Sequence, residues 1–344
     1  MRCLKILTII VLPLLMIACG SNSEQKSKNF SIVTNTEKNA ISNDETLTLS
    51  IKNSKNLAID SVVYKMNNLK ISNNLDLSNS KLGKQIIEAI VYYNEQNETV
   101  STNIIILNSF SPKIYSFNII NEYPHDITSY TQGLEFYNGE LYESTGQLGK
   151  SKLRKVDYKT GEVLENIDLA KEYFGEGLTI LNDNLYQLTW KSGIGFVYDV
   201  NTFEKKSNFK YGKSKEGWGL CNDGKVLYKS DGSENIWILD PETLVEKDHI
   251  QVYRNKGKVE NLNELEWING KIYSNSYQND GVAIINPENG AVEGLLNFSS
   301  LKKKVKQHPT LDVLNGIAYN PDTKTIFVTG KHWDKLFEVE IVEK

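Results

Sequence analysis

The stretch Asn138-Gly-Glu-Leu-Tyr-Glu-Ser144 is the first of five related segments that decide the fold of this 344-residue chain. Each copy is a tight turn followed by a short strand, and the aligned aromatic residues are separated by 44, 42, 45 and 54 residues. A period of this length, made of four short strands, is typical of a β-propeller blade. The repeat therefore predicts an all-β chain with a five-bladed β-propeller over residues 111–344. The later copies are Asn182-Asp-Asn-Leu-Tyr-Gln-Leu188, Asp223-Gly-Lys-Val-Leu-Tyr-Lys-Ser230, Asn269-Gly-Lys-Ile-Tyr-Ser-Asn275 and Thr323-Lys-Thr-Ile-Phe-Val-Thr329.

Two further patterns support the ring. Upstream of the turns, the units open with a small residue and an apolar one, as in Gly133-Leu134, Gly177-Leu178 and Gly219-Leu220. Before the first unit, residues 114–120 form an apolar run, and a similar run at 336–341 ends the chain. We expect these two segments to pair within one blade, because this pairing closes the ring and removes its open edge.

The composition excludes several classes of protein. The net charge is −4, so there is no basic excess of the kind that binds nucleic acid. With three cysteines and four histidines, a disulfide framework is excluded, and Cys221 is expected to be a small buried hydrophobic residue.

The N-terminus resembles a bacterial lipoprotein signal. Arg2 and Lys5 precede a short apolar run that ends at Cys19, and the next ten residues are polar. We expect a signal peptide at 1–18, lipid on Cys19 and a flexible tether at 19–29. The alternative is an uncleaved signal anchor. The expected location is the bacterial cell envelope, with the membrane contacted only through the lipid.

Residues 30–110 carry alternating runs at 46–51, 86–93 and 102–107, separated by turns rich in Asn and Ser. Short strands at this spacing predict a small immunoglobulin-like β-sandwich. No catalytic constellation occurs there, so we expect a spacer or docking module.

The candidate site lies where the inner strands of the propeller converge. The residues just before the Gly-Leu step are Gln132, Glu176, Trp218 and Asn315, with Asn263 or Glu264 in the fourth unit. The backbone pattern repeats there while the side chains differ, which indicates a binding site on that face. Trp190, Trp218 and Tyr277 are expected to wall a pocket with Trp333 near it, and Lys331 ends a neighbouring strand.

Metal binding has little support in the sequence. His125, His249, His308 and His332 have no ligand spacing, and no acidic cluster resembles a calcium loop. Asp231 is expected to act in a turn. We expect neither a metal nor another cofactor.

At these residues the chain resembles the plant-type glutaminyl-peptide cyclotransferases. The resemblance covers roughly 115–344 and rests on eight ordered stretches, of which Tyr130-Thr-Gln-Gly-Leu134, Phe174-Gly-Glu-Gly-Leu-Thr179 and Phe327-Val-Thr-Gly-Lys-His-Trp333 are examples. It implies a metal-independent acyltransferase that converts the N-terminal Gln of peptides or proteins to pyroglutamate and releases ammonia. Tyr130, Trp267 and Tyr277 depart from the family pattern by exchanging one aromatic residue for another.

The resemblance also implies the roles of the site residues. Glu176 matches the family's catalytic glutamate, and we expect it to act as general acid and base. The implied substrate-binding residues are Tyr130, Gln132, Phe174, Trp190, Trp218, Asn263, Tyr277 and Lys331. Two other functions remain open: a non-catalytic propeller that binds peptides or glycans at the cell surface, and a metal-dependent lactonase or hydrolase. We expect a monomer.

Overall fold

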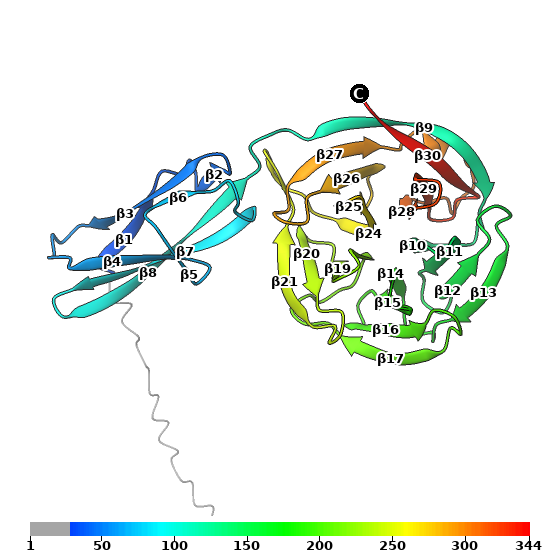
Figure 1. The fold of residues 1–344 in the computed structure, drawn as a ribbon, viewed down its shortest axis with the longest axis horizontal. Helices are drawn as coiled ribbons and strands as arrows, with labels where there is room; N and C mark the ends of the chain where they lie inside the picture. The colour runs from blue at the N-terminus through cyan, green and yellow to red at the C-terminus, as the bar shows by residue number, and fades with distance from the viewer. Residues whose placement is uncertain (1–27) are drawn as a thin grey trace, which may run out of the picture.

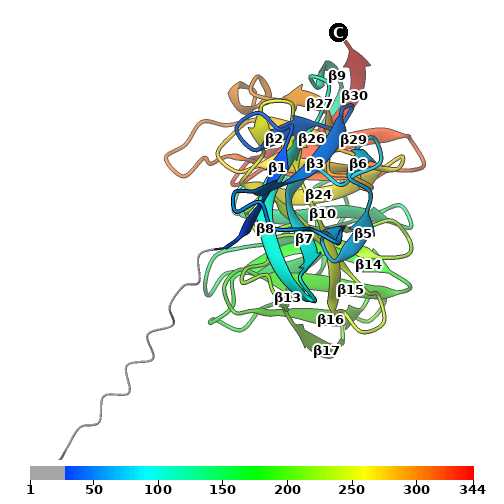
Figure 2. The ribbon, with the colours of Figure 1, turned by 90° about the vertical axis from the view of Figure 1, so that its left-hand side faces the viewer.

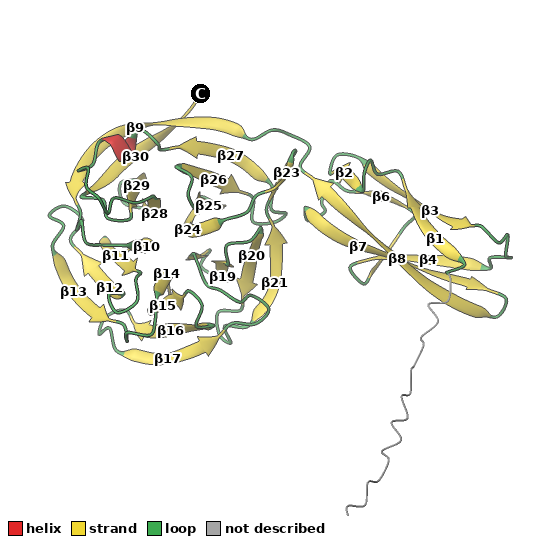
Figure 3. Ribbon diagram, turned by 180° about the vertical axis from the view of Figure 1, so that it is seen from behind, coloured by secondary structure: helices red, strands yellow, loops and turns green. Residues whose placement is uncertain are grey.

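The computed structural model describes residues 28–344, and the prediction of an all-β chain is confirmed. The only helix in this part of the chain is the three-residue 3₁₀ helix η1 (Leu301–Lys303), far shorter than a membrane span (Figure 3).

The N-terminal strands form two sheets that pack against one apolar core. One sheet has the strand order β1-β3-β6 and the other β2-β8-β7-β4-β5. The alternating runs predicted as strands at 46–51, 86–93 and 102–107 are confirmed within β3, β7 and β8. The bounds are β1 (Phe30–Thr34), β2 (Ala40–Ser42), β3 (Thr46–Asn53), β4 (Ser61–Met66), β5 (Leu69–Ile71), β6 (Asn74–Asp76), β7 (Gly83–Tyr93) and β8 (Gln96–Leu107).

Most of the remaining strands form four-stranded units arranged around a common centre, with β10, β14, β24 and β28 nearest to it (Figure 1). Three units are separate antiparallel sheets that follow the chain order. They comprise β10 (Thr131–Tyr137), β11 (Glu140–Thr145), β12 (Lys152–Val156) and β13 (Val163–Asp168); β14 (Gly175–Leu181), β15 (Asn184–Thr189), β16 (Ile194–Asp199) and β17 (Lys205–Lys210); and β18 (Leu220–Asn222), β19 (Leu227–Ser230), β20 (Asn235–Leu239) and β21 (Glu246–Gln251).

An eight-stranded sheet with the order β24-β25-β26-β27-β9-β30-β29-β28 completes the ring. In it, β9 pairs antiparallel with β30, as Phe117 opposite Ile341 illustrates, so the predicted pairing of the two apolar runs is confirmed. A short hairpin, β22–β23, lies between β21 and β24 in the chain. The bounds are β9 (Lys113–Pro124), β22 (Tyr253–Arg254), β23 (Gly257–Lys258), β24 (Leu262–Ile268), β25 (Lys271–Ser276), β26 (Gly281–Ile285), β27 (Val292–Asn297), β28 (Leu314–Asn320), β29 (Thr325–Gly330) and β30 (Lys335–Glu343).

The repeated turns have a local chemical cause. In the first hairpin, Asn138 and Gly139 both have positive φ angles of 50° and 79°, the backbone form that a two-residue hairpin requires. In the second turn of the same unit, the carboxylate of Asp157 accepts a hydrogen bond from the Lys159 amide at 2.8 Å, which closes the turn.

The glycine of the Gly-Leu step packs one unit against the next. A Cβ atom on Gly133 would lie 2.5 Å from the backbone nitrogen of Leu178, and one on Gly177 would lie 2.6 Å from that of Leu220. One on Gly219 would lie 2.0 Å from the carbonyl oxygen of Asn263. Any larger residue would therefore separate neighbouring inner strands.

The N-terminal sheets contact the side of the ring formed by β21 and the β26–β27 turn (Figure 1, Figure 2). Lys81 pairs with Asp248 at 2.5 Å, and the Leu82 amide donates to the Asn289 carbonyl at 2.9 Å. Tyr253 and Ala291 of the ring belong to the N-terminal apolar core. The two parts therefore share buried surface as well as a linker.

Candidate active site

The structure brings all nine predicted catalytic and substrate-binding residues together around one cavity of about 170 Å³. They lie at the start of the first strands of the units or just before them, or directly after the second strands, and these two ends meet in an antiparallel hairpin. The nine residues are Tyr130, Gln132, Phe174, Glu176, Trp190, Trp218, Asn263, Tyr277 and Lys331.

Irregular strand pairing aims several of these side chains at the centre. The register breaks at Gln132 in β10, around Glu176 in β14 and around Asn263 in β24, and a fourth break surrounds Asn315 in β28. Such bulges redirect a side chain away from the regular alternation of a strand. The break in β24 also decides which of the two candidates in the fourth unit belongs to the site. Asn263 lines the cavity, whereas Glu264 accepts a hydrogen bond from the Ile317 amide at 3.0 Å.

Glu176 is a buried carboxyl group whose proton affinity is increased by its surroundings. Only 4% of the residue is exposed, and desolvation raises its pKa well above the ordinary value. The positive charge of Lys331 and a hydrogen bond with Gln132 oppose this shift, while the negative charge of Glu216 adds to it. Because the pKa is raised, the group can hold and release a proton closer to neutral pH than an ordinary glutamate does.

The side-chain amides of Gln132 and Asn263, beside Glu176, keep hydrogen-bonding groups free for a ligand. Asn315 donates to the side-chain oxygen of Gln132 at 3.1 Å, which leaves the Gln132 amino group for the cavity. The side-chain oxygen of Asn263 is buried and has no hydrogen-bond partner within the described residues. A buried polar atom without a partner is costly, so this oxygen is available to a bound ligand.

Lys331 lies opposite Glu176 against two aromatic rings. Its Nζ atom is 4.6 Å from the Tyr130 ring centroid and 5.2 Å from that of Tyr277. Desolvation lowers the pKa of Lys331, although the charges of Glu176 and Asp312 oppose the shift. The Tyr130 hydroxyl donates to Asp312 at 3.1 Å, which fixes this ring at the mouth of the pocket.

Sequence reasoning missed Glu216, which holds two pocket walls in place. One of its carboxylate oxygens accepts the indole N–H of Trp190 at 2.7 Å and that of Trp218 at 2.9 Å. Phe174 and Tyr277 complete the walls, because their rings lie edge-to-face against Trp190 and Trp218 respectively. Glu216 has no distinguishing sequence pattern among 43 acidic residues, although it stands two positions before a predicted wall residue.

Other sequence candidates lie away from the cavity. Trp333, expected near the pocket, does not line it: the side chain is fully buried, packs beneath Gly330 and donates to the Asp312 carbonyl. Cys221 is buried, as expected. Asp231 accepts the Ser233 amide in a turn, and its second oxygen accepts from the indole of Trp237.

The donor set of the pocket does not fit a metal ion. Its lining contains one carboxyl group and no His or Cys. Across the described residues, no group of three or more His, Cys, Asp or Glu is placed to hold a metal. The predicted lipid site, Cys19, lies outside the described residues together with the signal peptide at 1–18 and most of the tether.

Comparison with known proteins gives a consistent result. A sequence model of the glutamine cyclotransferase family matches residues 88–341. Glutaminyl-peptide cyclotransferase of Arabidopsis thaliana is 42% identical over 236 residues, which are 67% of this chain and 73% of that protein. The crystal structure of Myxococcus xanthus glutaminyl cyclase is similar with a TM-score of 0.63 and 36% identity, and the match covers 68% of this chain and 99% of that one.

Proposed function

Because this chain belongs to the glutamine cyclotransferase family, we propose that it is an acyltransferase that cyclises the N-terminal glutamine of peptides or proteins to pyroglutamate. The observation that carries the proposal is the buried Glu176, with its raised pKa, inside an aromatic cavity of about 170 Å³. Pockets for drug-sized ligands measure about 300–1,000 Å³, so this one suits a group the size of a single side chain.

The reaction needs a folded substrate conformer and one proton carrier. The substrate's α-amine attacks its own γ-carbonyl carbon, a carbon–nitrogen bond forms, and the bond to the amide nitrogen breaks to release ammonia. An N-terminal amine has a pKa near ~7.7–8.0, so a neutral fraction exists at neutral pH. The aromatic walls hold the conformer that brings nitrogen and carbonyl together. Glu176 takes the proton from the attacking amine and delivers it to the departing nitrogen.

The polar groups around Glu176 are placed to bind the same substrate. Asn263 offers an unpaired side-chain oxygen to an N–H group of the substrate. Gln132, oriented by Asn315, and Lys331 are candidate donors to the γ-carbonyl oxygen as it gains negative charge. The cation at Lys331 also stabilises the ionised form of Glu176.

We also propose the finer architecture and location. The four-stranded units arranged around one centre support a five-bladed propeller over 111–344, and the two sheets sharing one core support an immunoglobulin-like domain at 30–110. The N-terminal sequence supports lipid attachment at Cys19, a tether to residue 29 and an envelope location. The chain acts as a monomer.

The test is ammonia release from a short peptide that begins with Gln, using the protein without its lipid. The product mass should fall by one ammonia, and a Glu176→Ala variant serves as the control. Ammonia release by the wild type alone supports the function and the role of Glu176. Peptide binding without ammonia release by either protein would instead support a binding function.

A further inference from the structure

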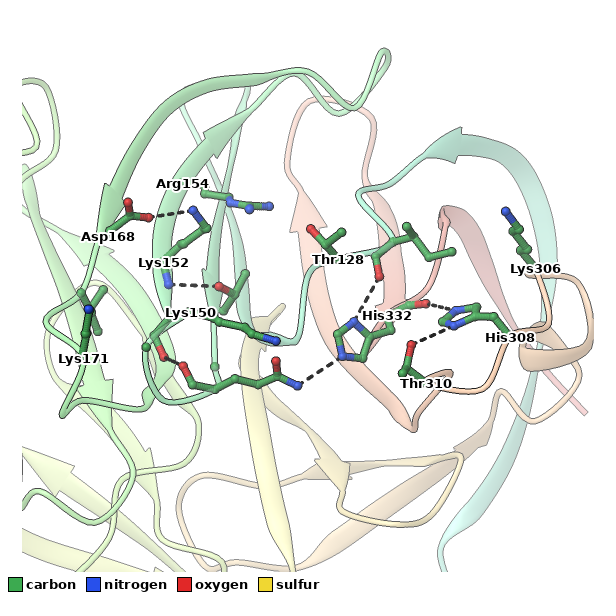
Figure 4. Close-up of a pocket in the computed structure, with 17 residues that line it drawn as sticks. Thr128, Lys150, Lys152, Arg154, Asp168, Lys171, Lys306, His308, Thr310 and His332 are labelled. Atoms are coloured by element: carbon green, nitrogen blue, oxygen red, sulfur yellow. Dashed lines mark hydrogen bonds and ion pairs between the residues drawn. The ribbon is translucent and has the colours of Figure 1, made fainter.

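A second cavity opens beside the catalytic pocket at the same end of the ring. It measures about 800 Å³ and lies among the β11–β12 and β13–β14 loops, residues 306–310 and the β29–β30 turn (Figure 4). These connections flank the strand ends that carry Glu176 and Lys331. Both cavities therefore face the same side of the molecule.

One layer of side chains separates the two cavities. Tyr130 lines the catalytic pocket and His332 lines the second cavity, and their ring centroids are 5.4 Å apart. His332 also contacts the side chain of Gln147 across the second cavity, at 3.3 Å. An extended chain advances about 3.3 Å per residue, so roughly two residues span the distance between these rings.

The second cavity is strongly basic in a chain whose net charge is −4. Four lysines and one arginine line it, against a single carboxylate. Two of these cations already form ion pairs: Lys152 with Asp168 at 2.7 Å, and Arg154 with Asp126, which lies outside the lining, at 2.8 Å.

Three cations remain free to bind a ligand. Among the described residues, Lys150, Lys171 and Lys306 form no ion pair, and all three are exposed. Figure 4 shows Lys150 and Lys171 on one side of the cavity and Lys306 on the other. We call the cavity bounded by these three lysines the basic cleft.

We propose that the basic cleft binds the substrate segment after the N-terminal glutamine and selects peptides with Asp or Glu from about the third residue onward. This inference rests on the proposed function. The catalytic pocket holds about one side chain, so the rest of a peptide has to leave through its mouth. The cleft beside that mouth is large enough for several residues, and its unpaired charge is opposite to that of an acidic segment.

The experiment compares two peptides that differ only in charge, Gln-Ala-Glu-Asp-Glu-Ala and Gln-Ala-Gln-Asn-Gln-Ala, both amidated at the C-terminus. Three exposed ion pairs together predict a kcat/KM about tenfold higher for the acidic peptide at low salt. Most of the difference should appear in KM, and it should disappear near 1 M salt, where the Debye length is about 3 Å.

The decisive variant is Lys150→Gln/Lys171→Gln/Lys306→Gln, for which the ratio of the two kcat/KM values should fall to about one. The matched control, Lys52→Gln/Lys70→Gln/Lys225→Gln, loses the same charge from exposed positions outside both cavities and should keep the wild-type ratio. Equal use of the two peptides by the wild type, or an unchanged ratio in the cleft variant, overturns this assignment and leaves the proposed function standing. Absence of ammonia from both peptides overturns both.

Discussion

Replacing Glu176 with glutamine isolates the proton-carrying role from every other property of the pocket. The amide has nearly the same volume as the carboxyl group and still hydrogen-bonds with Gln132. The three other titratable side chains of the lining are Tyr130, Tyr277 and Lys331, so no second carboxyl group can take over the role. Burial, the interaction with Asp312 and nearby negative charges raise the pKa of Tyr130 above the ordinary value of a tyrosine. Its hydroxyl is therefore a poor proton carrier near neutral pH.

The expected loss follows from this isolation. General acid–base transfer contributes about 10²–10⁴-fold to a rate. Glu176→Gln should therefore lower kcat by about two to four orders of magnitude, equivalent to roughly 3–5 kcal/mol of activation free energy. KM should change little, because the aromatic walls, Asn263 and Lys331 remain in place. The assay is ammonia release under steady-state conditions, with thermal unfolding measured in parallel.

Glu266→Gln is the matched control. Glu266 is also buried, burial also raises its pKa, and its carboxylate accepts the Tyr319 amide, yet it does not line the pocket. A glutamine oxygen can accept the same hydrogen bond, so this variant should keep nearly full kcat. A folded Glu176→Gln protein with kcat within tenfold of wild type would falsify the assignment of Glu176 as the proton carrier.

Three further outcomes are expected. The first concerns the limb of the kcat–pH profile that reports on Glu176 and is absent from Glu176→Gln. In Glu216→Gln this limb should move to lower pH, because a charge that raises the Glu176 pKa is removed. In Lys331→Gln it should move to higher pH, because a charge that lowers the Glu176 pKa is removed. Shifts in the same direction would contradict the electrostatic account. A chain starting at residue 111 should keep wild-type kcat, since no residue from 28–110 lines the pocket. Removal of the N-terminal sheets exposes Tyr253, which should lower the free energy of unfolding by about 2 kcal/mol and Tm by roughly 4–8 °C. Loss of kcat in a folded fragment would show that the N-terminal part supports the site. Extensive chelation should leave ammonia release unchanged, and a loss restored by added Zn²⁺ would favour the metal-dependent hydrolase.

The sequence predicts the repeated units well because their causes are local. The hairpin turn at Asn138-Gly139 needs positive φ angles, which Asn and Gly adopt easily, so the turn is visible as a dipeptide. The pairing of β9 with β30 is less local, but both segments are apolar and each would otherwise leave an open edge. The contact of the N-terminal sheets with Tyr253 and Ala291 has no such signal, because single apolar residues on a surface are common.

The sequence predicts which residues share the site more reliably than where each side chain points. Strand alternation cannot decide between Asn263 and Glu264, because the choice depends on a bulge that only the register reveals. Trp333 follows Lys331 by two positions, yet a tight turn directs it into the core beneath Gly330. Glu216 acts through the indole groups of other residues, so its own sequence neighbourhood carries no pattern.

The glycines of the Gly-Leu step also explain how a regular repeat can hold an irregular site. Gly177 and Gly219 bring adjacent inner strands into backbone contact, so these positions tolerate no side chain and must repeat. The residue just before each of them, Glu176 or Trp218, faces the cavity and is free of that packing requirement. Conserving the glycine therefore preserves the ring, while the preceding position can become a carboxylate, an indole or an amide. A substitution at Gly177 should accordingly disturb folding and Glu176 together, whereas one at Glu176 should disturb the chemistry alone.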